Sequence, residues 1–208
     1  MLDPLLRRWV DPPLDGIGGW LARQGLSANA TSLAGLTIGL LAVPLLAFHF
    51  YDAALLVILL NRTFDGLDGA IARRHGVTAF GGYLDILCDM AFYAAVPVGF
   101  ALASRDNALW AALLLASFVC TATSFLGRAA MARQRGESDN GQRGRKSFFY
   151  AGGLIEGTET IIAFVLFCAF PSAFPWLAAS FSGLCFWTAA ARLFDAYKVR
   201  IDSDKSNN

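Results

Sequence analysis

The chain contains six apolar segments that are each long enough to cross a lipid bilayer, and this feature limits the folds open to it. They cover residues 29–50, 53–74, 80–104, 108–132, 148–170 and 173–198. A helix rises about 1.5 Å per residue, so about 20 residues span a hydrocarbon core of about 30 Å. Inside that core a helix satisfies its own backbone hydrogen bonds. The pattern predicts an all-α integral membrane bundle of six transmembrane helices.

The composition supports a membrane protein and argues against a nucleic-acid binder. Hydrophobic residues make up 56% of the 208 residues and charged residues 16%, with a mean hydropathy of +0.49. A net charge of +1 gives no basic face for a nucleic acid backbone. We expect one six-helix domain over residues 29–200, preceded by a juxtamembrane segment over 1–28 and followed by a disordered tail over 201–208.

The juxtamembrane segment mixes leucines and tryptophans with charged residues and prolines. It is too polar and too broken for a signal peptide. Residues 14–24 predict a short amphipathic helix lying on the membrane surface. The alternative is a frayed terminus.

The distribution of Lys and Arg predicts the orientation in the membrane. Nearly all of them fall in the N-terminal region, the turn after the second segment, the loop 133–146 and the C-terminal region. The opposite face has Arg105 alone, and Arg62 lies within a segment. By the positive-inside rule, both termini face the cytoplasm. We therefore expect a multi-pass protein of the cytoplasmic (inner) membrane.

Four aspartates interrupt this apolar chain in the stretch FDGLDGAIARRHGVTAFGGYLDILCDM, residues 64–90. Asp65 and Asp68 are three residues apart and Asp85 and Asp89 four apart, so each pair projects from one helix face. The turn near Gly76 places the two pairs at the same cytoplasmic membrane edge. Clustered carboxylates repel one another unless a cation compensates them. Oxygen ligands at this density suit Mg²⁺ or Mn²⁺, with phosphate oxygens of a diphosphate substrate in the open positions.

The same stretch resembles the signature of the CDP-alcohol phosphotransferase family. That signature reads D-x-x-D-G-x-x-A-R, then seven or eight residues, then G-x-x-x-D-x-x-x-D, and all eight defining positions match. The resemblance implies an enzyme of EC 2.7.8 type. Such an enzyme moves a phosphatidyl group from a CDP-activated lipid, such as CDP-diacylglycerol, to a hydroxyl acceptor and releases CMP. The family's six-helix membrane domain and typical homodimer are implied as well.

The resemblance also implies roles for the matching residues. Asp65, Asp68 and Asp85 would be metal ligands, and Asp89 would contact the second of two metal ions and accept the proton of the acceptor hydroxyl. The CDP moiety would be bordered by Gly69, Ala72, Arg73 and Gly81. The stretch SANATSL, residues 27–33, resembles the P-N-x-x-T element before the family's first spanning helix, with Ala28 at the proline position. A nucleotide contact from Asn29 is implied, and the alternative is that Ser27 or Asn29 caps the helix.

Two groups of charged residues are candidates for binding the acceptor. Glu156 and Glu159 fall two to three turns inside the fifth segment, where acidic residues suggest a functional site. They could bind hydroxyls or an ammonium group, and pairing with Arg62 or Arg192 is the structural alternative. Cations at the cytoplasmic ends of the last three segments could bind an anionic acceptor such as a polyol phosphate, although topology alone also explains them; they are Arg128, Arg145, Lys146 and Arg192.

Two other functions use acidic residues in a membrane. A prenyl-diphosphate transferase also needs aspartate pairs and Mg²⁺, but its pattern lacks the D-G-x-x-A-R element. A divalent-cation transporter would place carboxylates along an ion path, and clustering at one membrane face rather than at the midplane argues against it. The acceptor alcohol cannot be read from the sequence.

Overall fold

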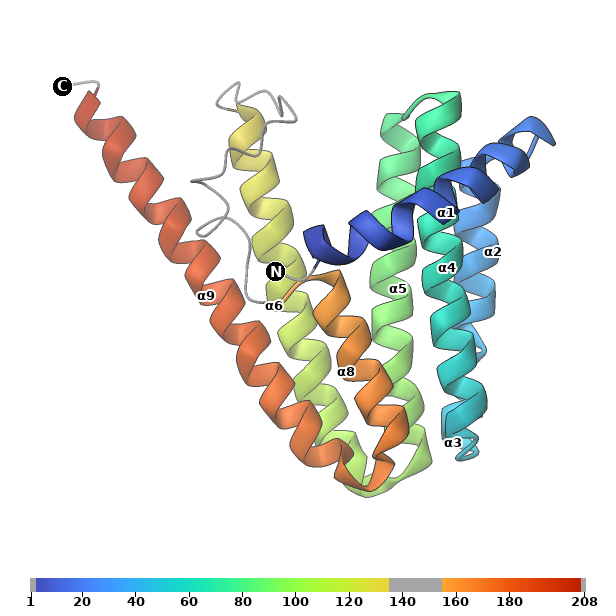
Figure 1. Ribbon diagram of the computed structural model, residues 1–208. Coiled ribbons are helices and arrows are strands. Elements are labelled where there is room, and N and C mark those ends of the chain that lie inside the picture. The colour runs from blue at the N-terminus through green and yellow to red at the C-terminus, as the bar shows by residue number, and fades with distance from the viewer. Residues whose placement is uncertain (1–2, 135–154, 207–208) are drawn as a thin grey trace.

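The computed structural model describes residues 3–134 and 155–206, and every element within these ranges is a helix (Figure 1). In chain order the elements are α1 (Asp3–Arg23), α2 (Ala28–Leu40), α3 (Ala42–Ala47), α4 (Tyr51–His75), α5 (Ala79–Ala103), η1 (Arg105–Asn107), α6 (Ala108–Gln134), α8 (Gly157–Ala169), η2 (Pro171–Ala173) and α9 (Phe174–Ser206). The predicted all-α class is confirmed.

Four helical stretches of the described residues are long and apolar enough to cross a membrane. They are Ala28–Ala47, Ala79–Ala103, Arg105–Met131 and Pro171–Lys198. By their length and composition they support an integral membrane protein. The six predicted crossings are not all confirmed, for two different reasons. α4 has 25 residues but carries the charged residues of the aspartate motif, and α8 is an apolar helix of only 13 residues within the described range.

The first predicted segment, 29–50, is broken into α2 and α3 at Leu41. Pro44 explains the break, since it has no N–H to donate to the carbonyl of Leu40 and its ring clashes with that carbonyl. The backbone N–H of Leu41 instead donates to the carbonyl oxygen of Ile38 at 3.0 Å. The turns between α3 and α4, α5 and α6, and α8 and α9 are short, as predicted, so these neighbours run antiparallel.

An aromatic cluster fills the centre of the bundle. Phe100 of α5 stacks on Phe174 of α9, with ring centroids 4.3 Å apart, and contacts Phe167 of α8 edge-on. Phe92 and Phe164 join the cluster, and all five side chains are almost completely buried. Since aromatic pairs add to the free energy of simple burial, this cluster holds α5, α8 and α9 together.

Replacing Phe100 by Ala tests the importance of this cluster. The variant should lose about 3 to 5 kcal/mol of stability, because the cavity removes ring contacts to three helices. Thermal unfolding of the purified protein in detergent, followed by the loss of the monodisperse peak, would measure the effect. Phe48→Ala is the control, since the Phe48 side chain is 72% exposed. Equal melting temperatures for the two variants would contradict the assignment of Phe100 to the core.

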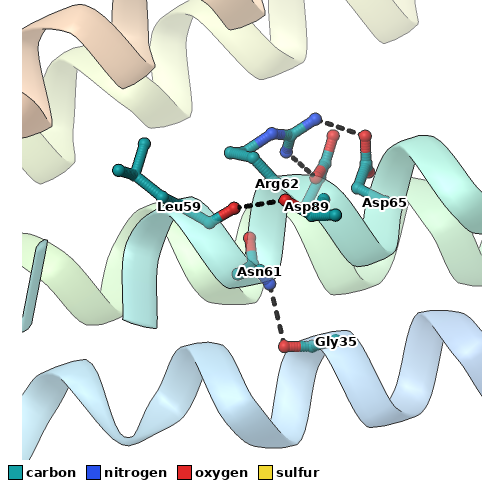
Figure 2. Close-up of polar contacts among 7 residues, drawn as sticks. Gly35, Leu59, Asn61, Arg62, Asp65 and Asp89 are labelled. Atoms are coloured by element: carbon teal, nitrogen blue, oxygen red, sulfur yellow. Dashed lines mark hydrogen bonds and ion pairs between the residues drawn. The ribbon is translucent and has the colours of Figure 1, made fainter. Parts of the chain in front are cut away.

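Close packing of α2 against α4 brings the polar residues of both helices together. A Cβ atom on Gly35 would lie 2.8 Å from Cβ of Phe64, and one on Gly39 would lie 2.8 Å from Nδ2 of Asn61. Only glycine allows this approach, as is common where membrane helices meet. The Asn61 amide donates a hydrogen bond of 2.9 Å to the carbonyl of Gly35, in the contact shown in Figure 2.

Helix α1 lies across α4 near the turn that joins α4 to α5 (Figure 1). It begins at Asp3, earlier than the predicted start at Leu14, because Pro12 and Pro13 lie within the helix instead of ending it. Its contact with α4 is close at Gly66, where a Cβ atom would lie 2.4 Å from Cδ1 of Leu14, and at Gly18, which meets Ala70. The position of α1 on a membrane surface stays a prediction.

The last two helices differ in length from the predicted segments. Of the predicted segment 148–170, residues 148–154 lie outside the described residues, and α8 begins at Gly157. α9 continues to Ser206, so residues 201–206 of the expected disordered tail are helical. Residues 201–208 contain no proline or glycine, the residues that most often end a helix, so α9 can continue into them.

Candidate metal and substrate site

The turn between α4 and α5 positions the aspartates. Gly76 ends α4 with a positive φ of 98°, a conformation that favours glycine, and its N–H donates to the carbonyl of Ala72 at 3.0 Å. Thr78 caps α5, and its hydroxyl accepts a hydrogen bond of 3.0 Å from the Gly81 N–H. The chain reverses within three residues, so the end of α4 lies beside the start of α5, as the sequence predicts.

Three of the four aspartates converge closely enough to share a metal ion. Carboxylate oxygens of Asp65, Asp68 and Asp85 all lie within 4.8 Å of one another. Asp68 is buried, and Asp65 and Asp85 are half-buried. All four aspartates line one pocket between α2, α4 and α5, and we call these four residues the aspartate cluster. Hard oxygen donors at this separation suit Mg²⁺ or Mn²⁺.

The fourth aspartate is joined to the others through an arginine that the sequence analysis did not assign to the site. One guanidinium nitrogen of Arg62, on α4, donates a hydrogen bond of 2.8 Å to Oδ1 of Asp89. The other terminal nitrogen donates a hydrogen bond to Asp65 (Figure 2). Its side chain is 23% exposed. One hint was present in the sequence: Arg62 is a lone arginine in an apolar stretch, three residues before Asp65, where a helix places an ion-pair partner.

Two further polar residues of the pocket, Ser32 of α2 and Asn61 of α4, were not indicated by the sequence. The hydroxyl of Ser32 donates to the carbonyl of Ala28 at 3.1 Å, and Ser32 lines the pocket together with Asp68. Asn61 lines the same pocket, and among the described residues its buried Oδ1 atom has no hydrogen-bond partner. A buried acceptor without a partner is costly, so this side of the pocket is suited to a ligand that donates a hydrogen bond.

The residues expected to border the CDP moiety are on α2, α4 and α5, the helices that form the aspartate pocket, and each has its own contacts. A Cβ atom on Gly81 would lie 3.3 Å from Oδ1 of Asn29, so Asn29 is adjacent to the start of α5. Ser27, not Asn29, is the N-cap of α2, and its hydroxyl accepts from the Ala30 N–H. Arg73 forms an ion pair of 2.7 Å with Asp15 of α1.

Around Gly69 and Ala72 the surface of α4 is less open than its small residues suggest. A guanidinium nitrogen of Arg73 lies 3.4 Å from the position of a Cβ atom on Gly69, and Ala72 is half-buried. Gly66 is in close packing contact with Leu14 of α1.

Glu156 and Glu159 lie at the start of α8 and not two to three turns inside a helix. Glu156 is the N-cap, and Glu159 accepts a hydrogen bond of 3.1 Å from the Glu156 N–H in a capping box. The difference arises because helix α8 starts only at Gly157, after an extended residue at Glu156. Both carboxylates satisfy backbone donors of the helix and complement its dipole, which is a structural role.

Of the four cationic candidates for binding the acceptor, the structure describes two, Arg192 and Arg128. Arg192 of α9 is buried, donates to the carbonyl of Thr121 at 3.3 Å and lies over the ring of Phe125. Arg128 of α6 is half-buried. Arg145 and Lys146 lie outside the described residues.

These features define a membrane-embedded protein with an acidic pocket able to hold a metal ion at one end of a helix bundle. Residues 26–192 match the family model of CDP-alcohol phosphatidyltransferase. The chain therefore belongs to the CDP-alcohol phosphatidyltransferase family. It is a transferase of the EC 2.7.8 type in phospholipid biosynthesis, and it transfers a phosphatidyl group from a CDP-lipid.

Two relatives have similar sequences. Inner membrane protein YnjF of Escherichia coli (strain K12) is 48% identical over 198 residues, which are 95% of this chain and 96% of that protein. Archaetidylinositol phosphate synthase of Pyrococcus horikoshii is 36% identical over 102 residues, 47% of this chain and 52% of that protein. The first similarity and the four apolar spans identify an integral membrane protein.

Solved structures share the fold. Mycobacterium tuberculosis phosphatidylinositol phosphate synthase (PgsA1) with CDP-DAG bound matches with a TM-score of 0.71 and 24% identity, over 88% of this chain and 93% of that chain. The same protein in complex with manganese and citrate matches with a TM-score of 0.64 and 25% identity, over 88% of each chain.

Proposed function

We propose that this protein transfers the phosphatidyl group of CDP-diacylglycerol, or a closely similar CDP-lipid, to a hydroxyl group of a small acceptor. The new bond joins the acceptor oxygen to the phosphorus that carries the lipid, and the bond from that phosphorus to the CMP oxygen breaks. The observation that carries the proposal is the convergence of Asp65, Asp68 and Asp85 from two helices, with oxygens within 4.8 Å. The CDP-DAG bound to the M. tuberculosis synthase supports the choice of donor.

The aspartate cluster is proposed to hold two divalent ions, Mg²⁺ or Mn²⁺. Asp65, Asp68 and Asp85 fit one ion by their donor type and separation, and Asp89 would contact the second. When bound, the ions would neutralise charge on the diphosphate and on the departing CMP. Manganese in the M. tuberculosis synthase supports the metal type.

Asp89 is proposed to accept the proton of the acceptor hydroxyl. Its Oδ1 atom accepts a hydrogen bond from Arg62, which holds the carboxylate in one orientation before the second ion binds. A half-buried position beside the pocket allows a small alcohol to reach it.

The nucleotide is proposed to lie over the start of α5 and the adjoining face of α4. Asn29 and Gly81 are adjacent, and Gly69 and Ala72 offer small side chains beside Asp68. Arg73 would meet a phosphate of the donor after leaving Asp15. The side chains of Arg73 and Asp15 are about half exposed, so breaking their ion pair costs little free energy.

The acceptor is proposed to be anionic, such as a polyol phosphate. Buried Arg192 carries a positive charge into the interface of α6 and α9, and among the described residues its Nε atom has no hydrogen-bond partner. Arg128, Arg145 and Lys146 would extend the same attraction. Glu156 and Glu159 would then act by holding Arg192 and the start of α8, with any contact to acceptor hydroxyls secondary. Two similar proteins are named as synthases of archaetidylinositol phosphate and of phosphatidylinositol phosphate, which favours this acceptor class.

We further propose six membrane crossings, with the site on the cytoplasmic face of the inner membrane, and a homodimer. α4 packs against α2 and α5 and has the length of a crossing, which supports its inclusion. The excess of Lys and Arg near the aspartate end supports the orientation.

One assay tests the function. Purified protein with Mg²⁺ and CDP-diacylglycerol should release CMP with one acceptor from a panel of inositol phosphate, glycerol 3-phosphate, inositol, serine, choline and ethanolamine, and we expect a phosphorylated polyol. Release with a neutral acceptor would overturn the anionic assignment alone. Diphosphate release from a prenyl donor, or metal flux into vesicles without CMP release, would instead support the two alternative functions.

A further inference from the structure

The contact between Arg62 and two aspartates points to a role in metal loading, and this inference rests on the proposed function. We infer that Arg62 is a built-in counter-cation of the aspartate cluster, which competes with a divalent ion for Asp65 and Asp89. It is a positioning residue for Asp89, and it lies outside the matched family signature, which begins at Asp65.

The geometry places Arg62 where a cation between the two helices would lie. One nitrogen of the guanidinium contacts Asp65 on its own helix, and the other contacts Asp89 on α5 (Figure 2). The guanidinium group of Arg62 therefore bridges α4 and α5. Asp65 also belongs to the group of three carboxylates close enough to share an ion. A single carboxylate is thus used by both the arginine and the candidate metal site.

The charges explain why this bridge matters. Four carboxylates line one pocket, and their repulsion is costly at partly buried positions. Among the ion pairs of the described side chains, Arg62 alone contacts the aspartate cluster, since Arg73 is paired with Asp15. Arg62 stabilises the cluster before loading. The same positive charge repels an incoming divalent ion at Asp65 and Asp89.

The consequence is a coupling between metal loading and Asp89. A divalent ion that binds an oxygen of Asp65 or Asp89 must weaken the hydrogen bond from Arg62 to that carboxylate. The second ion therefore binds with lower affinity than it would if Arg62 were absent. The arginine also keeps Asp89 oriented until that ion arrives. Removing the guanidinium should therefore tighten metal binding, in contrast to the loss expected for a structural residue.

Metal titration without substrate tests this inference. In isothermal titration calorimetry of the full chain in detergent, Arg62→Gln should bind Mn²⁺ about tenfold tighter than wild type, or bind one more ion, because a unit charge beside the ion has been removed. Arg62→Lys should give a smaller increase, about threefold, because its single ammonium cannot hold both carboxylates in the same fork. Arg105→Gln, an equal charge change at the far end of α5, should match wild type.

Unchanged or weaker Mn²⁺ binding in Arg62→Gln would overturn the inference. If that variant does not fold, an unchanged isotherm for Arg62→Lys overturns it by itself. In the metal-free state Arg62→Gln should also melt at a lower temperature and gain more from Mn²⁺ than wild type does. CMP release by wild type reports the proposed function separately, so a failed titration with normal turnover rejects only the role of Arg62.

Discussion

Asp89→Asn is expected to abolish phosphatidyl transfer while leaving the fold and the Asp65, Asp68 and Asp85 site in place. The asparagine keeps the shape of the side chain and can still accept a hydrogen bond from Arg62, but it cannot take the proton of the acceptor hydroxyl. Loss of a positioned base typically lowers the rate about 10² to 10⁴-fold. CMP release at saturating donor and acceptor measures this loss as a fall in kcat.

The binding measurements separate a chemical defect from a structural one. We expect Asp89→Asn to bind a first Mn²⁺ ion and the CDP-lipid within a few-fold of wild type. Asp106→Asn is the control, because Asp106 is exposed on η1 beyond the far end of α5. Turnover by Asp89→Asn at the wild-type rate would show that another group takes the proton.

Sequence reasoning could predict the aspartate site because helix geometry and one turn determine it. Spacings of three and four residues put each aspartate pair on a single face, and Gly76 reverses the chain between them. These local rules hold in any fold that keeps the two helices. Apolar length predicts the membrane bundle in the same way.

The remaining contacts of the site could not be predicted, because they depend on how separate helices meet. Ser32 lines the same pocket as Asp68 because Gly35 and Gly39 let α2 approach α4 closely. Arg73 pairs with Asp15 because α1 crosses α4, and no local pattern indicates that crossing. Arg62 shows the limit best: its spacing to Asp65 was visible, but its contact with Asp89 needed the position of α5.

The predicted ends of the helices were also wrong in places, because single residues end a helix where the mean hydropathy of the segment predicts that it continues. The apolar stretch before Phe48 favours one continuous helix, yet Pro44 breaks it at Leu41. Glu156 and Glu159 were expected within a helix, yet together they cap α8. The second case changes the functional interpretation, since satisfied capping carboxylates are weaker candidates for acceptor ligands than free membrane-embedded ones.

Asp68→Asn should have the largest effect of any single change, because Asp68 is the most central ligand of the proposed metal site. Its side chain is buried, and a carboxylate oxygen of Asp68 lies within 4.8 Å of oxygens of both Asp65 and Asp85. Loss of an outer-shell partner alone typically costs about 10 to 100-fold in metal affinity, so loss of a ligand should exceed about 100-fold. Calorimetry should detect no Mn²⁺ binding at millimolar metal, and CMP release should be undetectable.

Thermal unfolding can show that this loss is not a folding defect. Removing one of four crowded carboxylates relieves repulsion, so metal-free Asp68→Asn should melt at or above the wild-type temperature. Because an ion that binds only the native state raises its stability, Mn²⁺ should raise the melting temperature of wild type and of Asp52→Asn, a change at the other end of α4, but not of Asp68→Asn. A melting temperature of Asp68→Asn that rises with Mn²⁺ as in wild type would place the metal site elsewhere.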